Sequence, residues 1–247
     1  MAIDLEIFIE GQRIASDQVE NWERRSAAKA LRKLGVPSGN QDLEQLRQQL
    51  LDRKHALGHG GIRALLRREL ALSDLVARLV ARLSRGRRRY SVIEIFSPVG
   101  NAEAFANWFE EVARLNREDV MIAALPEHYL IATDAVGRQE VIETNGGAPM
   151  AARFFVDYTD LSSLVSEADP DYPIQVAGVA RAPNGAAIGG VRHQFRNEGT
   201  GFRAKLTVEF PSLIMPSVVA GHRWHLACEF SNWIRAAIAE LHPGSTM

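Results

Sequence analysis

The sequence has only one cysteine, Cys228, in 247 residues. A single cysteine cannot form an internal disulfide, and this usage is typical of proteins that fold in the reducing cytosol. The chain also lacks any apolar run of the roughly 18 to 20 residues that a membrane-spanning helix needs. Its acidic start, MAIDLEIFIEG, lacks the basic head and apolar stretch of a signal peptide. We therefore expect a cytoplasmic protein.

Neither sign of charge dominates the composition. Thirty acidic and 29 basic residues give a formal net charge of −1, so the whole molecule has no long-range attraction to nucleic acid or to anionic membranes. The one basic run, RLSRGRRRY at residues 82–90, could contact nucleic acid or acidic lipid, but such runs are usually solvated linkers. No nucleic-acid-binding motif is recognised. We expect neither a nucleic-acid partner nor a membrane partner.

The first third of the chain, residues 1–90, has the pattern of a helical region. Residues 39–58 have a capping candidate at Asn40, early acidic residues, leucines at helical spacing and a glycine stop at Gly58. The segment 60–89 continues the pattern with a broad apolar stripe, which consists of Leu65, Leu66, Leu72, Leu75, Val76, Leu79, Val80 and Leu83. So wide a stripe must be buried against the rest of the chain or against another subunit. We expect it to support a homodimer.

The pattern changes to that of strands near residue 90. Seven segments are β-branched or alternate between apolar and polar residues, namely 90–100, 128–135, 138–144, 152–159, 174–181, 189–195 and 202–210. A helix is expected over 101–116, and a longer helix over 217–241. This order predicts an α+β fold in which residues 91–247 form a curved antiparallel sheet crossed by the C-terminal helix. It resembles the helix-grip fold of Bet v 1 and START-type proteins, whose sheet and helix enclose an apolar cavity of the kind that holds a ligand.

The long C-terminal helix contains a pair of candidate metal ligands. In GHRWHLACEFSNWI, residues 221–234, His225 and Glu229 are four residues apart and therefore lie on one face of a helix. An imidazole nitrogen and a carboxylate oxygen at this spacing can share a divalent ion, and zinc accepts both. Such pairs also occur by chance or as hydrogen-bonded surface pairs. Here the neighbouring residues are largely apolar, and a buried histidine and glutamate need a partner.

Two further ligands can come from the segment LPEHYLIATDAVGRQEVIETNGGAP. If a hairpin turns near Val136 and Gly137, His128 and Glu143 lie at the same end of adjacent strands. Glu140 competes with Glu143, because a shift of one residue exchanges their faces. His222, one turn before His225, is the alternative on the helix. In the simpler interpretation, His128 only ends a strand and Glu143 is solvated.

Three segments at these residues resemble the 2,4-diacetylphloroglucinol and phloretin hydrolases. They are ANWFEEVARLNREDVMIAALPEHYL, VIETNGG and HLACEFSNWIRAAIAEL, which are similar to the family's aromatic helix with Pro-x-His, its Glu-x-x-Gly stretch and its His-x-x-x-Glu-x-Ser helix. The resemblance covers about residues 100 to 240. It implies a Bet v 1-like domain with a catalytic zinc bound by His128, Glu143, His225 and Glu229. The tryptophan-dense helix of that family is reduced here to Asn-Trp-Phe-Glu at residues 107–110.

The same resemblance implies hydrolysis of a carbon–carbon bond in an acylated phenolic or polyketide-like molecule. A bound metal polarises the acyl carbonyl and supplies hydroxide, and a general acid must protonate the leaving ring carbon. His193 is the candidate acid or orienting donor, because it alternates with Arg192 on a strand, and Tyr129 is a candidate donor to phenolic oxygens. The expected substrate pocket consists of Trp108, Tyr158, Phe230 and Trp233.

Two other functions stay open from the sequence. A non-catalytic carrier could hold an apolar or aromatic ligand in the same cavity, and it would tolerate loss of His225. A cyclase, dehydratase or lyase could use the same cavity or metal for a different reaction on a polyketide-like compound. Aromatic residues on strands and a histidine on a strand are more often packing residues than catalytic ones.

Overall fold

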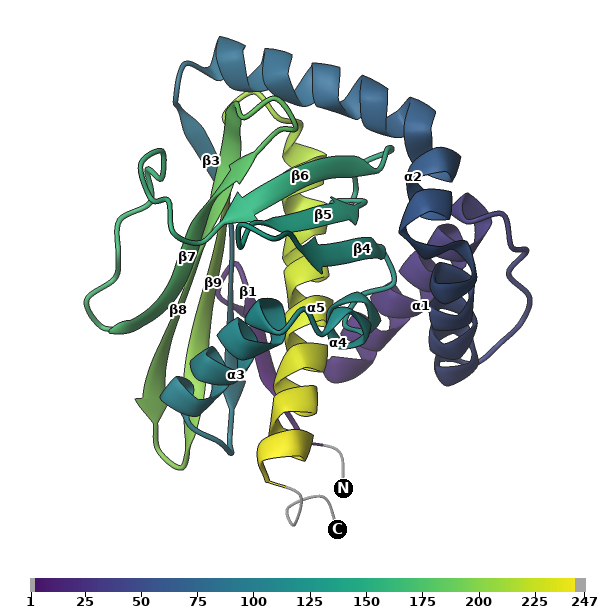
Figure 1. The fold of residues 1–247 in the computed structure, drawn as a ribbon. Helices are drawn as coiled ribbons and strands as arrows, with labels where there is room; N and C mark the ends of the chain where they lie inside the picture. Colours follow the sequence, from purple (N-terminus) through teal and green to yellow (C-terminus); the bar gives the residue numbers. More distant parts are fainter. Residues whose placement is uncertain (1–2, 243–247) are drawn as a thin grey trace.

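Nine strands form one antiparallel sheet in the computed structural model, which describes residues 3–242 (Figure 1). In chain order the elements are β1 (Glu6–Ile9), β2 (Gln12–Ile14), α1 (Ser16–Lys33), α2 (Leu43–Ser84), β3 (Arg88–Ser97), α3 (Ala102–Arg114), α4 (Glu118–Ala123), β4 (His128–Thr133), β5 (Gln139–Glu143), β6 (Ala152–Asp157), β7 (Ile174–Arg181), β8 (Ala187–Glu198), β9 (Gly201–Pro211) and α5 (Pro216–Leu241). The expected α+β class, with a long antiparallel sheet and a C-terminal helix, is confirmed.

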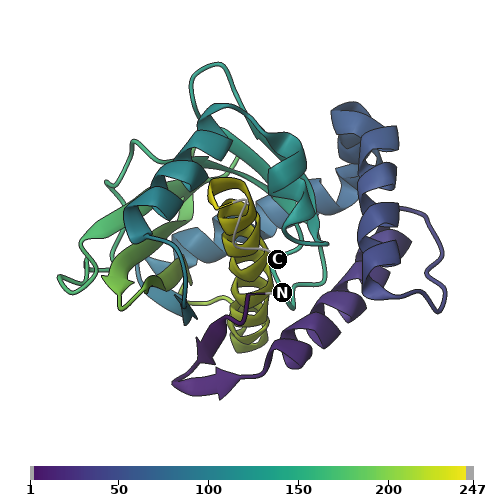
Figure 2. The same cartoon turned by 90° about the horizontal axis from the view of Figure 1, so that it is seen from below.

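The strands follow the spatial order β2-β1-β3-β9-β8-β7-β6-β5-β4. Strands β4 to β9 form a continuous meander, and β9 then pairs along its whole length with β3. The sheet curves so that its two ends lie on either side of α5, which runs through the middle of the molecule (Figures 1 and 2). Residues from opposite ends of the sheet can therefore approach the same helix.

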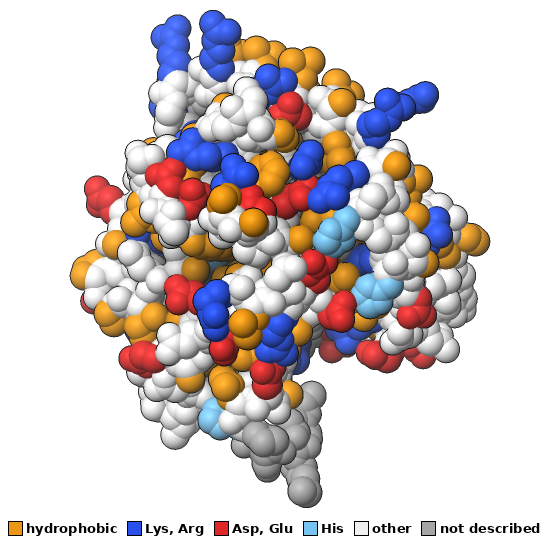
Figure 3. Space-filling model, viewed as in Figure 1, with side chains coloured by type: hydrophobic (Ala, Val, Ile, Leu, Met, Phe, Trp, Pro, Cys, Tyr) orange, Lys and Arg blue, Asp and Glu red, His pale blue; other side chains and the backbone are white. Residues whose placement is uncertain are grey.

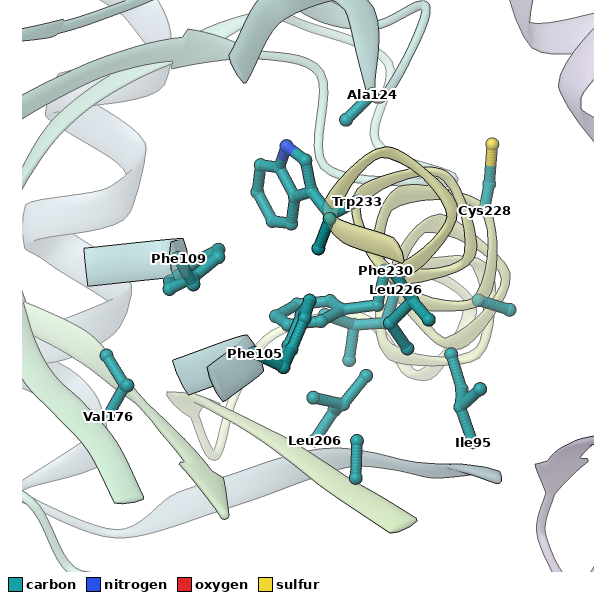
Figure 4. Close-up of a cluster of buried hydrophobic side chains, with 14 of the residues drawn as sticks. Ile95, Phe105, Phe109, Ala124, Val176, Leu206, Leu226, Cys228, Phe230 and Trp233 are labelled. Carbon is teal, nitrogen blue, oxygen red and sulfur yellow. The ribbon is translucent and has the colours of Figure 1, made fainter. Parts of the chain in front are cut away.

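The concave face of the sheet is filled by α3 and α5. Both helices contribute aromatic side chains that pack on one another: Phe109 stacks on Phe230 with ring centroids 5.7 Å apart and meets Trp233 edge-on at 5.0 Å. Leu206 of β9 and Ile95 of β3 complete this core from the sheet (Figure 4). The helix α5 is apolar over most of its circumference because it contacts the sheet, α1 and α3 rather than solvent.

A second core lies on the opposite face of the β4–β5 hairpin. There α1 and α2 bury a set of apolar side chains that includes Leu31, Leu50 and Ile62, against Leu130 and Ile142 of the hairpin. The helix α2 bends at Gly58, whose φ of 57° and ψ of 179° fall in a region almost restricted to glycine. The expected helix stop at Gly58 is thus a sharp kink, after which the second half of α2 crosses the top of the sheet (Figure 1).

The N-terminal region is helical over 16–33 and 43–84 but begins with two strands. Leu5, Ile7 and Ile9 are buried and alternate with more exposed residues, and Glu10 and Gly11 form the turn to β2. Strand β1 pairs with β3, so this segment extends the sheet. The description of residues 1–90 as a helical region is therefore wrong for residues 6–14. None of the helices within residues 3–242 is both long and apolar enough to cross a bilayer.

Candidate metal centre

A β-bulge at the start of β4 directs His128 towards α5. The pairing of β4 with β5 shifts between His128 and Leu130, so one extra residue enters the strand and the faces of its side chains are exchanged beyond that point. Ile131 packs in the concave core and Leu130 packs in the second core. Regular alternation from Ile131 would turn His128 to the convex face. The bulge instead places it, fully buried, on the concave side beside α5.

Glu143 lies directly opposite His128 in the hairpin. The register pairs the two residues across β4 and β5, and the turn runs through 134–138, so the expected hairpin is confirmed. Val141 and Glu143 share the concave side, whereas Glu140 lies on the other side and pairs with Arg63 at 2.6 Å and with Arg153 at 2.7 Å. The register therefore excludes Glu140 from the cluster and leaves Glu143 in it.

His225 and Glu229 come from successive turns of α5, on the face turned to the hairpin. Gly146 donates its backbone N–H to Nδ1 of His225 at 3.3 Å, which leaves Nε2 directed at Glu143. Glu229 lies one turn further on, with Oε1 3.2 Å from Nε2 of His128. Both residues are buried, as the apolar sequence around them predicts.

Three of the four predicted ligands form one compact group, and Glu229 adjoins it through its contact with His128. Nε2 of His128 is 3.3 Å from Oε2 of Glu143, and Nε2 of His225 is 3.7 Å from the same oxygen. One ligand atom each of His128, Glu143 and His225 lies within 4.8 Å of the others. The two imidazole ring centroids are 5.5 Å apart. This spacing is short enough for both rings to reach one ion at metal–nitrogen distances near 2 Å.

The charges in this cluster do not balance without a further cation. Burial raises the pKa of Glu143, but the neighbouring His225 and His128 rings outweigh it and hold that pKa below its ordinary value. Burial lowers the pKa of His225, and the two carboxylates offset this only in part. For His128, burial is outweighed by Glu143 and Glu229, which raise its pKa to about 9. Since a histidine must lose its proton to bind a metal, a divalent cation would take the place of the His128 proton and neutralise the two buried carboxylates.

The hydrogen bonds of His128 fit a metal ligand. Its Nδ1–H donates to the backbone carbonyl of Met121 at 3.0 Å, which fixes the ring and leaves Nε2 as the free nitrogen. Nε2 is fully buried and has no hydrogen-bond partner among the described residues, because the contacts to the two carboxylates lack hydrogen-bond geometry. A buried nitrogen without a partner between two carboxylate oxygens suits a bound cation. The donor set fits zinc and also fits iron or manganese.

A largely apolar cavity of about 270 Å³ adjoins the cluster. Glu143, His225 and Glu229 form part of its wall, and the rest comes from the concave side of the sheet, from α5 and from the second half of α2. Val208 and Phe210 of β9 line it as well, which explains why they are less buried than the residues that precede them in the same alternating strand. The cavity is large enough for a small organic ligand next to the proposed ion.

Two further histidines line this cavity. His193 faces inward while Arg192 faces outward towards Gln175, as the alternation predicts. Nδ1 of His193 is buried without a partner among the described residues, and burial lowers its pKa to about 3. The ring is therefore neutral near pH 7, which argues against a role for His193 as the general acid that protonates the leaving carbon. His222 stacks on His225 at 4.7 Å, and its Nδ1 contacts Oγ of Ser91 at 3.1 Å.

Tyr129 does not face the cavity. Its hydroxyl contacts Oγ of Thr144 at 3.0 Å on the convex side of the hairpin, beneath α1, where it borders a separate hollow with Lys29 and Lys33. The bulge that directs His128 inward also turns Tyr129 outward. Tyr129 therefore lies outside the cavity in which we expected it to contact a substrate.

Two of the four residues predicted for the substrate pocket line the cavity. Tyr158 and Trp233 line the cavity. Trp108 instead packs in the core and donates its indole N–H to Glu240 at 3.1 Å. Phe230 is buried among Phe109, Trp233 and His193 and does not reach the cavity wall. Both aromatic residues are core residues.

Two residues that hold the centre together were not predicted from the sequence. Gly146 and Gly221 allow the loop after β5 to lie directly on α5: a Cβ atom added to Gly221 would meet the carbonyl oxygen of Gly146 at 2.4 Å. The signal was present in the stretch VIETNGG, where two glycines follow a candidate ligand. Met121, whose carbonyl fixes His128, carries no such signal because any residue supplies a carbonyl.

Comparisons with known proteins give no identity. No protein-family model matches the chain, and no curated protein matches it. Among solved structures, protein Ms6760 from Mycobacterium smegmatis is similar over 62% of this chain and 93% of its own, with 14% sequence identity and a TM-score of 0.35. A likeness at this level carries no argument about function.

Proposed function

We propose that this chain is a metal-dependent hydrolase that cleaves a carbon–carbon bond in an acylated phenolic or polyketide-like molecule. The observation that supports it is the compact group of His128, Glu143 and His225, with Glu229 in contact with His128, beside an apolar cavity. Within the described residues, Nε2 of His128 is buried and has no hydrogen-bond partner. The likeness of these residues and their neighbours to the phloroglucinol-type hydrolases supports the reaction class. The same likeness makes zinc the proposed ion and the helix-grip class the proposed fold.

The protein's own residues supply ligands, orientation and exclusion of water. The two imidazoles and two carboxylates would hold the ion, and Met121 and Gly146 fix the imidazole rings from the backbone. A zinc ion with an open position polarises a carbonyl and lowers the pKa of bound water. The apolar wall formed by Val141, Val156 and similar side chains excludes bulk water from the bond to be cleaved.

Polar groups elsewhere in the cavity are suited to orient a phenolic ring. Tyr158 lines the cavity and donates its hydroxyl to Oε1 of Gln139 at 3.4 Å, and burial raises the pKa of that hydroxyl, which keeps it a donor. The neutral ring of His193 carries one free nitrogen that can pair with a substrate hydroxyl. In this proposal His193 orients the substrate, and the proton for the leaving carbon comes from another group or from water.

A carrier function is the second candidate, because the wall of the cavity is mainly apolar. A carrier needs no ion, whereas the hydrolase does. A cyclase or lyase would share the ion with the hydrolase and differ in its products. These differences define the test.

The experiment is metal analysis of the purified protein together with its variants. We expect about one equivalent of a divalent metal in the native protein and a loss of at least tenfold in affinity in His225→Ala and in Glu229→Ala, since each removes one of four ligands. His55→Ala is a matched control, because His55 is exposed on α2 and contacts Asp119 away from the cluster.

The reaction is tested with the metal-loaded protein and monoacetylphloroglucinol and phloretin as probes, followed by product analysis. Release of the free ring and a carboxylic acid, lost in His225→Ala and retained in His55→Ala, supports hydrolysis. Metal binding with rearranged products instead would assign a cyclase or lyase. If the native protein lacks stoichiometric metal and still binds phloretin, the enzyme proposal is wrong and the carrier function is favoured.

A further inference from the structure

The second half of α2 carries an apolar face that the rest of the chain does not cover. Its members, each between 41% and 57% exposed, are Leu65, Leu72, Leu75, Val76, Leu79 and Leu83. They recur at helical spacing, so they form one stripe along a helix whose opposite side packs on the sheet through Leu66, Leu70 and Ser73. We call these six residues the α2 stripe. Contiguous exposed leucines of this extent mark an interaction surface.

The same segment concentrates the positive charge of the molecule. Residues 59–89 contain nine arginines and two acidic residues, a balance of +7 in a chain whose total is −1. The two acidic residues are neutralised by ion pairs, Glu69 with Lys33 and Asp74 with Arg78. Six exposed arginines form no ion pair within the described residues, namely Arg67, Arg68, Arg82, Arg85, Arg87 and Arg89. Basic side chains stand out from this end of the molecule in Figure 3.

This charge decides between two occupants of the stripe. A twofold contact with a second copy would bring the same surface of both copies together, and unpaired arginines would then face arginines. An anionic lipid surface instead offers phosphate groups to the arginines and an apolar layer to the leucines, which is the environment that basic amphipathic helices occupy. The expectation of no membrane partner treated the basic run at residues 82–90 as a solvated linker and did not connect it with the apolar stripe on the same helix.

The stripe also borders the cavity. Val76 belongs to the stripe and lines the cavity, and Ala77 and Val80 of the same helix turns line it too. Met215, which is half exposed at the start of α5, lines the cavity beside them. A surface that covers the α2 stripe therefore lies at the edge of the cavity.

We propose that the α2 stripe and its unpaired arginines dock this protein on an anionic phospholipid bilayer, with the edge of the cavity against the membrane. An apolar ligand dissolved in the bilayer can then enter past Val76 without crossing water. The leucines insert at the level of the headgroups, and the arginines pair with lipid phosphates. This docking does not depend on the metal centre, so its test is independent of the test of the proposed reaction.

The test is co-sedimentation of the full chain with two kinds of vesicle. One is pure phosphatidylcholine and the other an equimolar mixture of phosphatidylcholine and phosphatidylglycerol. We expect binding to the mixed vesicles alone, weakened by high salt and unchanged by a metal chelator. Arg82→Ala with Arg85→Ala should weaken it roughly fivefold for each arginine removed, and Leu75→Ser with Leu79→Ser should abolish it.

Matched controls test whether binding requires the α2 stripe and its arginines in particular. Leu115 is as exposed as Leu79 but ends α3 away from α2, so Leu115→Ser should bind as the native protein does. Arg24→Ala with Arg25→Ala removes two exposed arginines of α1 instead. Circular dichroism verifies that each variant is folded.

Three outcomes overturn the proposal. The first is equal binding to both vesicles or full binding by the Leu75→Ser, Leu79→Ser variant. The second is a dimer in light scattering that this variant disperses, with no vesicle binding, which would assign the stripe to a second copy. The third is a monomer that binds neither vesicle.

Discussion

At the scale of single residues, Lys54 is the most deeply buried cation of α2. Its Nζ donates to the carbonyls of Ile122 and Leu125 at 2.9 and 3.3 Å, and burial lowers its pKa from 10.5 to about 7. Between these two pH values the unfolded chain binds more protons than the folded one, so the free energy of unfolding rises with pH. Below about pH 7 both states are protonated and this contribution to the pH dependence vanishes.

We therefore predict that Lys54→Met removes part of the rise in stability between about pH 7 and pH 10. The slope lost is at most about 1.4 kcal/mol per pH unit. Urea unfolding at a series of pH values measures it, with Lys29→Met as a control because Lys29 is exposed on α1. If the native protein and Lys54→Met show parallel curves, the amine is not desolvated as its burial implies.

The candidate ligands could be predicted from the sequence, but the prediction of His128 did not include the bulge that orients its side chain. Spacing alone places His225 and Glu229 on one helix face, and the turn near Gly137 sets the register of Glu143. His128 faces the cluster only because of the bulge after it, and no residue at 128–130 signals a bulge. The same gap explains the error at Tyr129, since a bulge exchanges the faces of neighbouring side chains.

At the scale of elements, the loop after β5 and the helix α5 approach more closely than any side chain would allow. A Cβ atom added to Gly146 would lie 2.4 Å from the carbonyl oxygen of Gly221 and 2.9 Å from Cβ of His225. This contact sets the distance between Glu143, which precedes the loop, and His225, which follows one turn after Gly221. The geometry of the metal centre thus depends on two glycines that bind nothing.

Gly221→Ala should push the loop and the helix apart. We expect a loss of about 1–3 kcal/mol in the free energy of unfolding, as for other overpacked contacts, and a weaker affinity for the metal. Gly60→Ala is the control, because Gly60 lies in α2 with nothing within 4 Å of the added atom, and alanine there favours the helix. Urea unfolding and metal titration of both variants measure the effects. A Gly221→Ala protein as stable as Gly60→Ala would contradict the close packing.

Most elements after residue 88 are predictable from the sequence because their apolar periodicity is long and bounded by turn residues. Strand β7 matches its predicted bounds, and α5 begins one residue earlier than expected. Strand β1 was missed although Leu5, Ile7 and Ile9 alternate, because four residues are too short for a firm period. Its place beside β3 depends on a pairing over more than eighty residues of chain, which local patterns do not encode.

At the scale of the whole molecule, the cluster joins the hairpin at one edge of the sheet to the central helix. Strand β4 is the last strand of the sheet and pairs only with β5, while α5 follows β9, at the far side of the meander. His128 and Glu143 belong to the hairpin and His225 and Glu229 to α5. A bound ion would therefore tie an edge of the sheet to the central helix, and the arginine-rich α2 covers the cavity between them.

Removal of the metal should consequently lower the stability of the entire chain. An ion that binds only the folded state contributes about 4 kcal/mol when its free concentration is a thousandfold above Kd, which corresponds to a fall in Tm of roughly 10 °C for a chain of this size. We expect a chelator to lower the Tm of the native protein and of His55→Ala by this amount. Glu143→Gln should already unfold at the lower temperature and should not respond to the chelator. Equal shifts in Glu143→Gln and in the native protein would mean that the chelator acts elsewhere, and that the cluster does not bind the ion that stabilises the fold.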